Sequence, residues 1–272
     1  MRVRTVTIAW LFLAETAVAF AQADPVGRLD ATRHGSLTLR EAMEAIARSE
    51  PPQAVAPLRL LLSHPDPEVA RMAGFLLRRM GDFGEAVRVA GAALGDSGLD
   101  PAARVSAALA LGELRIGAAQ APLFTALAGD PEVRVRVQAA RSLGDLARPG
   151  AFDALDAAAR GDPEPLVRLA AARALGQVPD AAPASLVALL ADMDAGVRQE
   201  ACWALGRRAV RSALPSLIGV LESDPDCRVR SQAAWALGQI GDPAAIEPLR
   251  QASASTCRRA VQAAAFALSQ LE

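Results

Sequence analysis

DPDCRVRSQAAWALG, residues 224–238, is the stretch that decides the fold, because the chain repeats it. At about 100° per residue its apolar side chains share one face of a helix. These are Val229, Ala233, Ala236, Leu237 and, just beyond the stretch, Ile240. Asp224 has the chemistry of a helix N-cap, Pro225 suits the first helical position, and Gly238 followed by Gly241 provides a stop. The stretch therefore predicts one amphipathic helix that must pack against neighbours.

Copies of this stretch recur at short, regular intervals. Three further copies keep the full spacing from Asp to Gly, and they cover residues 130–144, 162–176 and 192–206. Weaker copies end at Arg78, Gly112 and Ser269, towards the two ends of the chain. Successive copies end 30 to 34 residues apart, which is the sequence signature of a repeat architecture.

A second, shorter apolar segment lies between consecutive copies, for example residues 213–221 and 244–249. Each repeat is therefore predicted to be a helical hairpin. Tetratricopeptide repeats have a similar period but need aromatic landmarks that are missing here, and ankyrin repeats need a TPLH-type turn that is also missing.

The repeat resembles the short HEAT-like repeat of the phycobilisome-lyase type, whose motif is D-P-x-x-x-V-R-x-x-A-x-x-A-L-G. One copy matches it at Asp162, Pro163, Val167, Arg168, Ala171, Ala174, Leu175 and Gly176. The resemblance covers residues 54–272 and implies an all-α, right-handed α-solenoid of about seven hairpins. It says less about function, because this family includes enzymes, scaffolds and designed binders.

The N-terminus resembles a secretory signal peptide. Arg2 and Arg4 precede a short apolar run, and small residues up to Ala23 suit cleavage before Asp24. The run is shorter than the about 20 residues that span a bilayer. We therefore expect residues 1–23 to be removed, leaving an exported periplasmic or extracellular protein without a membrane span. A retained anchor and a wrongly assigned start codon are the alternatives.

Residues 24–37 are polar and unpatterned and are predicted to be a flexible tether. Thr38 and Glu41 then form a capping-box pattern, followed by apolar residues at helical spacing. An amphipathic helix over residues 38–50 would cover the open face of the first repeat.

Composition argues against nucleic-acid binding. The chain has 29 basic and 30 acidic residues, and its formal net charge is −1. A nucleic-acid-binding protein needs a basic surplus for phosphate contacts. We expect a protein or peptide partner, no nucleic acid, and a monomer.

In each of the four full copies an Arg follows the Val and an Asp begins the copy. Because equivalent positions of neighbouring repeats lie one above the other, we interpret these residues as a structural ladder, in which Arg bonds the Asp or the loop carbonyls of a neighbouring repeat. The predicted ladder comprises Asp130, Arg136, Asp162, Arg168, Asp192, Arg198, Asp224 and Arg230, with Arg104 at the corresponding position of an earlier repeat.

The three cysteines are interpreted as structural. Cys202 takes the place of a small residue on a buried helix face and is expected to pack. Cys227 and Cys257 occupy equivalent loops of adjacent repeats. Packed helices lie about 8–10 Å apart, beyond the about 7 Å between Cα atoms that a disulfide spans. We therefore expect these two cysteines not to be bonded.

The sequence offers little for catalysis. Its two histidines, His34 and His64, are interpreted as tether and loop residues. Deoxyhypusine hydroxylases resemble this chain in fold but bind iron through His-Glu pairs, and no such pair occurs here. The resemblance leaves a phycobilin-type lyase or an iron-dependent oxidoreductase as the alternative function. We expect no enzyme activity, cofactor or metal.

The candidate partner site lies beside the buried stripe of the repeated helix. In the family it resembles, these positions line a concave surface, and engineered relatives vary them to obtain binders. Aromatic and Arg side chains dominate interface hot spots, so this face is predicted to grip an extended segment or helix of a partner. Its residues are Arg141, Arg173, Gln177, Gln199, Trp203, Arg207, Gln232, Trp235, Gln239 and Phe266.

Overall fold

The computed structural model describes residues 55–271, apart from residues 180 and 255. The predicted signal peptide, tether and capping helix, together with the cleavage position between Ala23 and Asp24, lie outside the described residues. The chain divides into two compact units at Ser142 and Leu143. We describe each unit by itself.

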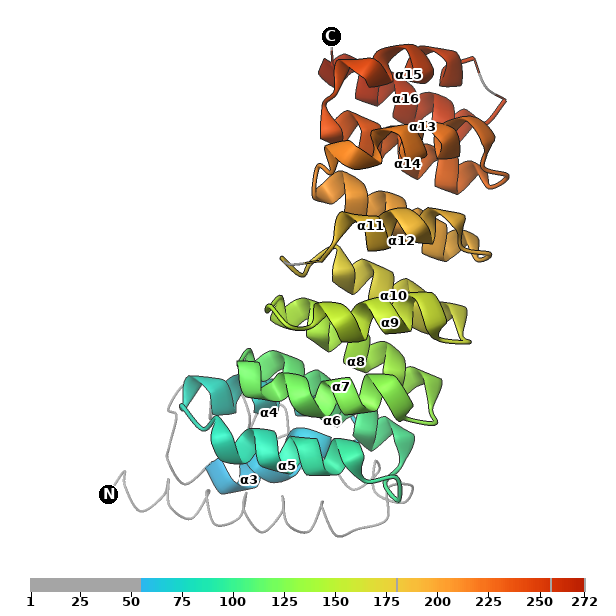
Figure 1. The fold of residues 1–272 in the computed structure, drawn as a ribbon. Coiled ribbons are helices and arrows are strands. Elements are labelled where there is room, and N and C mark those ends of the chain that lie inside the picture. The colour runs from blue at the N-terminus through green and yellow to red at the C-terminus, as the bar shows by residue number, and fades with distance from the viewer. Residues whose placement is uncertain (1–54, 180, 255, 272) are drawn as a thin grey trace, which may run out of the picture. The chain divides into compact units, whose positions relative to one another are not determined.

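The first unit contains the first hairpins of the chain (Figure 1). In each hairpin we call the odd-numbered helix the first helix and the even-numbered helix the second helix. Second helices pack on second helices, as α4 does on α6, and first helices pack on first helices, as α5 does on α7. The elements are α3 (Val55–Leu60), η3 (Leu61–Ser63), α4 (Pro67–Arg79), α5 (Gly84–Gly95), α6 (Pro101–Leu114), η4 (Gly117–Ala119), α7 (Gln120–Gly129) and the larger part of α8 (Val133–Leu146).

The second unit begins with the last turn of α8 and continues in the same pattern. Helices α10, α12, α14 and α16 pack on one another in chain order, and α13 packs on α15 (Figure 1). The elements are α9 (Phe152–Gly161), α10 (Pro165–Leu175), α11 (Pro183–Ala188), η5 (Leu189–Ala191), α12 (Ala195–Arg207), η6 (Arg211–Ala213), α13 (Leu214–Ser223), α14 (Cys227–Ile240), η7 (Pro243–Ala245), α15 (Ile246–Ala252) and α16 (Arg258–Leu271).

The predicted all-α solenoid of about seven hairpins is confirmed for the described residues, which form α-helices α3 to α16 and no strand. Successive helices pack as hairpins, as α5 does with α6 and α13 with α14. The predicted apolar stripe of residues 224–240 is also confirmed. Val229, Ala233, Ala236 and Leu237 are fully buried, and Ile240 is 5% exposed. Leucine and alanine make up most of the core. The small alanine side chains let the stacked helices approach closely.

The expected N-cap is wrong by two residues. Helix α14 begins at Cys227, and its N-cap is Asp226, which accepts a hydrogen bond from the backbone N–H of Arg228. The Asp224 carboxylate is occupied elsewhere, because it accepts from the N–H of Asp226 and from the Arg198 guanidinium. The first acid of the loop thus joins repeats, and the second begins the helix.

Two glycines of the repeat have different roles. Gly241 ends α14 in the left-handed conformation, with φ at 71°, where glycine is favoured. Gly238 lies inside the helix instead of ending it, and a Cβ there would stand 2.8 Å from the Cβ of Ala267 in α16. The repeated glycine is therefore needed for close approach of the next helix.

None of the described helices is long and apolar enough to cross a membrane.

Candidate partner-binding site

The predicted partner residues lie on or just after the second helices. Arg141 is exposed on the part of α8 that belongs to the first unit. The other nine lie in the second unit, and we call them the Trp203 face. Within it Arg173, Arg207, Gln239 and Phe266 are exposed, whereas Gln177, Gln199, Trp203, Gln232 and Trp235 are half-buried.

Each tryptophan of this face lies over the glycine of the preceding repeat. Trp203 Cζ3 stands 3.1 Å from the point where a Cβ on Gly176 would lie, and Trp235 Cζ3 stands 2.8 Å from the equivalent point at Gly206. The absent glycine side chain leaves room for the indole. Packing across repeats therefore accounts for the buried part of each ring, and the remainder faces solvent.

Trp203 is contacted by two arginines from successive helix ends. The guanidinium carbon of Arg173, in α10, lies 5.4 Å from the centre of the indole, and that of Arg207, at the end of α12, lies 5.3 Å away. A guanidinium over an indole face is attracted by the ring's quadrupole. The pair is thus held at a defined place, while its N–H edges stay available for hydrogen bonds.

A carboxylate, Glu200, completes this cluster from the same face of α12. Its Oε1 lies 3.9 Å from Nη1 of Arg173, and its buried Oε2 has no hydrogen-bond partner among the described residues. Burial raises the pKa of Glu200, and the nearby Arg173 opposes that rise. Glu200 was not among the predicted site residues. Its position three residues before Trp203, on the same side of a helix, was the signal that could have identified it.

The charges of the second helices gather at this cluster. Outside their first turns and the ladder arginines, α10, α12, α14 and α16 carry only Arg173, Glu200 and Arg207 as charged residues. Glutamine, alanine and aromatic side chains occupy the rest of the face. Phe266, the last aromatic of the series, is 55% exposed, and it is not among the nearest atoms to the preceding Gly238.

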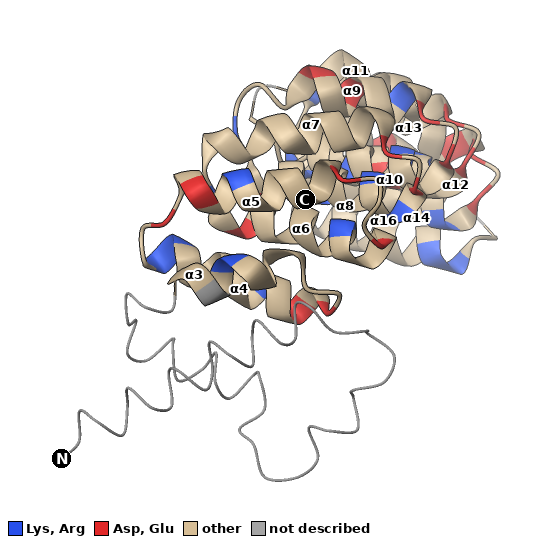
Figure 2. Ribbon diagram, turned by 90° about the horizontal axis from the view of Figure 1, so that it is seen from below, with Lys and Arg blue, Asp and Glu red and all other residues tan. Residues whose placement is uncertain are grey.

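The predicted ladder residues lie at the other end of the second helices. Three arginines each bind the carboxylate of the next repeat with both Nε and Nη2 at 2.7–3.1 Å. These bidentate pairs are Arg104–Asp130, Arg168–Asp192 and Arg198–Asp224. Their side chains are at most 11% exposed, so the pairs are largely desolvated. Figure 2 shows acidic residues concentrated in the loops before α10 and α12.

The remaining nitrogen of the ladder arginines, Nη1, donates hydrogen bonds to backbone carbonyls of its own repeat. Nη1 of Arg168 donates to the carbonyls of Asp162 and Pro163, and Nη1 of Arg136 likewise donates to the carbonyl of Asp130. The expected carbonyls of a neighbouring repeat are therefore those of the same repeat. Arg230 keeps this bond, at 2.6 Å to the Asp224 carbonyl, but pairs with no carboxylate of the described residues.

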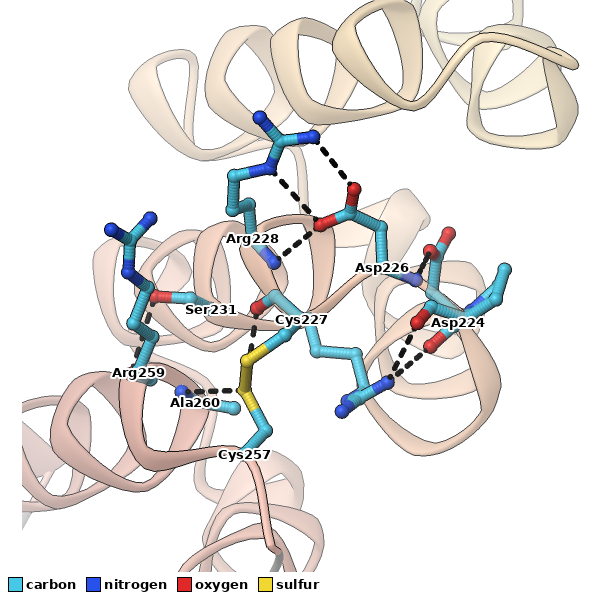
Figure 3. Close-up of a disulfide and its surroundings, with 10 residues drawn as sticks. Asp224, Asp226, Cys227, Arg228, Ser231, Cys257, Arg259 and Ala260 are labelled. Atoms are coloured by element: carbon cyan, nitrogen blue, oxygen red, sulfur yellow. Dashed lines mark hydrogen bonds and ion pairs between the residues drawn. A yellow bond between two sulfur atoms is a disulfide. The ribbon is translucent and has the colours of Figure 1, made fainter.

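A disulfide joins Cys227 to Cys257 (Figure 3), which contradicts our expectation from sequence. The expectation applied the spacing of helix axes to residues that lie at helix starts. Cys227 is the first residue of α14, and Cys257 directly precedes α16, so their Cα atoms are only 5.8 Å apart. This distance is within the usual range for a disulfide.

The remaining candidate residues have structural surroundings. Cys202 is fully buried, and burial raises the pKa of its thiol to about 12. His64 Nδ1 accepts from the N–H of Asp66, the bond that an Asp side chain makes in later repeats. Burial lowers the pKa of His64, which favours the neutral imidazole that accepts this bond.

Two features of the described residues bear on ligand binding. A shallow depression of about 410 Å³ lies beside the ladder, between Asp192, Ser216 and Asp224, where the carboxylates are already paired. Within the described part of the chain, no group of three or more His, Cys, Asp and Glu lies close enough to hold a metal ion.

Comparisons with known proteins agree with the repeat architecture. YibA from E. coli has a TM-score of 0.56 at 17% identity, covering 94% of this chain and 95% of its own. Kap121p has a TM-score of 0.57 at 15% identity, covering 86% of this chain and 31% of its own, so it is a much longer protein. The CpcE–CpcF complex of phycocyanin lyase from Nostoc sp. PCC7120 has a TM-score of 0.48 at 26% identity, covering 56% of this chain and 98% of its own.

A search of curated proteins gave no match by sequence. A model of HEAT repeats matches residues 87–176, 121–191 and 183–269, which together span most of the chain. At 17% and 15% identity the likenesses to YibA and Kap121p show the fold alone. The matched repeats, together with the stacked hairpins of each unit, show that the chain belongs to the HEAT-repeat family.

Proposed function

We propose that this protein is an exported binding module whose Trp203 face holds an extended segment or a helix of a partner protein. The observation that carries the proposal is the difference between the two ends of the second helices. The ladder end uses its arginines in buried ion pairs, whereas the Trp203 face presents two half-buried indoles and two exposed arginines.

The chemistry of this face suits a protein surface. Tryptophan and arginine are enriched among residues that contribute most to interface affinity, because they bury large areas and form directed contacts. The glutamines around them offer both donors and acceptors to a peptide backbone. Kap121p, a structural neighbour, has been crystallised bound to Nup53p.

Site-specific photocrosslinking tests the location of the partner site. A benzophenone amino acid is placed singly at Gln199, Gln239 or Phe266 on the Trp203 face, and at Ala188 or Glu222 as exposed controls on the first helices. We expect crosslinks to one partner from the Trp203 face and none from the controls. Crosslinks from the controls alone would place the binding site on the other side of the repeats.

The variant Trp203→Ala/Trp235→Ala tests the contribution of the two indoles. We expect it to keep its helical circular dichroism signal and to lose the crosslinked partner, because loss of a hot-spot aromatic costs about 2 kcal/mol or more. A folded double variant that binds with unchanged affinity would contradict the proposal.

Export is part of the proposal and is supported by the disulfide, since such bonds persist in oxidising compartments. Intact-mass measurement of the protein from the cell envelope should give a chain that begins at Asp24. A chain that retains Met1 and is found in the cytosol would contradict it.

Metal analysis separates the binding module from an iron-dependent enzyme. Purified protein should contain no stoichiometric iron. Iron bound at one or two atoms per chain, together with its loss on substitution of the residues that hold it, would favour the enzyme alternative.

A further inference from the structure

We infer that the Trp203 face selects partner segments that carry a carboxylate, which binds between Arg173 and Arg207 over the indole of Trp203. The inference rests on the proposed function, since it names the chemistry that this same face recognises. It commits to an Asp or Glu side chain of a partner peptide, in the same segment as a large apolar residue that contacts Trp235.

The first step is that both guanidiniums are held in place but not satisfied. Each lies against Trp203, with its charged carbon 5.3–5.4 Å from the ring centre. Arg173 is 56% exposed and has a single acidic neighbour, Glu200, at 3.9 Å, which is too long for a hydrogen bond. Arg207 is exposed and makes no ion pair or side-chain hydrogen bond with the described residues.

The second step is that the rest of the molecule shows what this chain's arginines do when a carboxylate is within reach. Arg104, Arg168 and Arg198 each take one with Nε and Nη2 together. Arginine's planar fork matches a carboxylate in this bidentate way and makes stronger hydrogen bonds than neutral pairs do. At Trp203 the two exposed forks have no such acceptor among the described residues, so they remain available to a carboxylate of a partner.

The third step is the charge balance of the face. Two guanidiniums and one carboxylate give the cluster a formal charge of +1, and α10, α12, α14 and α16 carry no other charged side chain outside their first turns and the ladder. Glu200 neutralises only part of the positive charge of the two arginines. Its Oε2 is buried and has no hydrogen-bond partner among the described residues. Charge complementarity therefore favours an acidic segment over a basic or neutral one.

The spacing of the repeats adds a prediction about the partner sequence. Neighbouring packed helices lie about 8–10 Å apart, and an extended chain rises about 3.3 Å per residue. The partner residue at Trp203 and the partner residue at Trp235, in the next second helix, should therefore stand three positions apart. We expect an Asp or Glu and a large apolar residue at that separation.

Selection from a phage library of random dodecapeptides tests the inference with a defined probe. The full chain is the bait, and parallel baits are Arg173→Gln/Arg207→Gln, Trp203→Ala/Trp235→Ala, and the charge-matched control Arg211→Gln/Arg258→Gln, which alters two exposed arginines away from this face. Selected peptides are then synthesised with each acid replaced by its amide, and their affinities are measured by fluorescence anisotropy.

The expected result is enrichment of acidic peptides that depend on both arginines. Replacing the carboxylate by an amide, or using the Arg173→Gln/Arg207→Gln variant, should lower affinity about tenfold or more, with no such loss in the control. The variant Glu200→Gln should bind these peptides more tightly, because it removes the competing negative charge.

Other results overturn the inference in distinguishable ways. Peptides that need the tryptophans but show no preference for acids, or that bind equally to the arginine variant, leave the proposed function in place and contradict the carboxylate. Peptides that bind equally to the Trp203→Ala/Trp235→Ala variant, or no enriched peptides at all, contradict the proposed function and the inference together.

Discussion

Arg168 and Arg173 lie five positions apart in α10 and have opposite surroundings. Nε and Nη2 of Arg168 donate at 2.9 Å each to the two oxygens of Asp192, Nη1 donates to backbone carbonyls, and the side chain is 11% exposed. Arg173 is 56% exposed, lies over Trp203, and reaches only a distant carboxylate. The comparison shows that the next repeat, and not the residue type, decides whether an arginine joins repeats or remains available to a partner.

The difference has a physical cause. The loops after α11 and α13 each bring an acid opposite the start of the preceding second helix, where little water remains. At the other end of the second helix the next repeat brings an aromatic ring, which attracts a guanidinium by its face and leaves the edges open. One end of the helix is thus closed by ion pairs, and the other is left for recognition.

Breaking a ladder pair should have the largest effect. Arg198→Gln removes the partner of Asp224, whose side chain is only 5% exposed. An uncompensated buried charge costs about 3–5 kcal/mol. Urea unfolding should show this loss, and the double variant Arg198→Gln/Asp224→Asn should recover part of it. Equal losses in the single and double variants would mean that the pair contributes no specific interaction.

The junction between α14 and α16 differs from the others. Arg230 has no carboxylate partner there among the described residues, and the Cys227–Cys257 disulfide joins the two helices instead. Removing it with Cys227→Ser/Cys257→Ser should cost about 2–4 kcal/mol. The loss should be local, so amide exchange should accelerate in α15 and α16 more than in α9 and α10. Uniform acceleration over the second unit would show that the bond stabilises the whole unit instead.

On the Trp203 face, substitution should affect binding more than folding. Trp203→Ala alone should weaken partner binding by about 2 kcal/mol, and the helical signal should persist because the leucine and alanine core is untouched. Titration of the identified partner, with thermal unfolding in parallel, measures both effects. A variant that unfolds as readily as Arg198→Gln would assign Trp203 to the core.

Protonation of a ladder carboxylate at low pH should lower the free energy of unfolding, with the smallest effect of these changes. Burial works to raise the pKa of Asp192, but hydrogen bonds from Arg168 and from the N–H of Asp194 outweigh it and hold the pKa below the ordinary value of 3.8. Its contribution to stability is therefore present above pH 3.8 and is lost as the pH falls through the lower, folded-state value.

A comparison with Asp192→Asn isolates this contribution. The difference in unfolding free energy between the protein and this variant should be constant above pH 3.8 and should shrink below it. A difference that stays constant down to pH 2 would show that Asp192 is not the titrating group.

The repeat pattern predicted the fold because each copy has apolar residues at the same helical positions. Val229, Ala233 and Leu237 could be identified by helical spacing alone. Asp224 was correctly placed in the ladder, but it was also expected to be the N-cap, because an N-cap and a ladder acid have the same sequence signature. Its bonds to Arg198 and the capping by Asp226 separate the two roles. The disulfide was missed for a similar reason, because distances at helix starts do not follow the spacing of helix axes.

For the site, sequence indicated which residues lie on the Trp203 face but not how they combine. Trp203 and Arg173 belong to different repeats, and their stacking depends on the close approach that Gly176 permits. Helical spacing could have placed Glu200 beside Trp203, but not the burial of its Oε2, which depends on how the neighbouring repeat packs.

The matched pair Arg168→Gln and Arg173→Gln tests the account most directly, because both remove one positive charge from the same helix. Unfolding free energy and binding of a selected acidic peptide are measured for each. We expect Arg168→Gln to lose about 3 kcal/mol of stability or more while its folded fraction binds normally. Arg173→Gln should lose less than about 0.5 kcal/mol of stability and bind about tenfold more weakly. Equal stability losses in the two variants, or normal binding by Arg173→Gln, would contradict the division of the helix into a structural end and a recognition end.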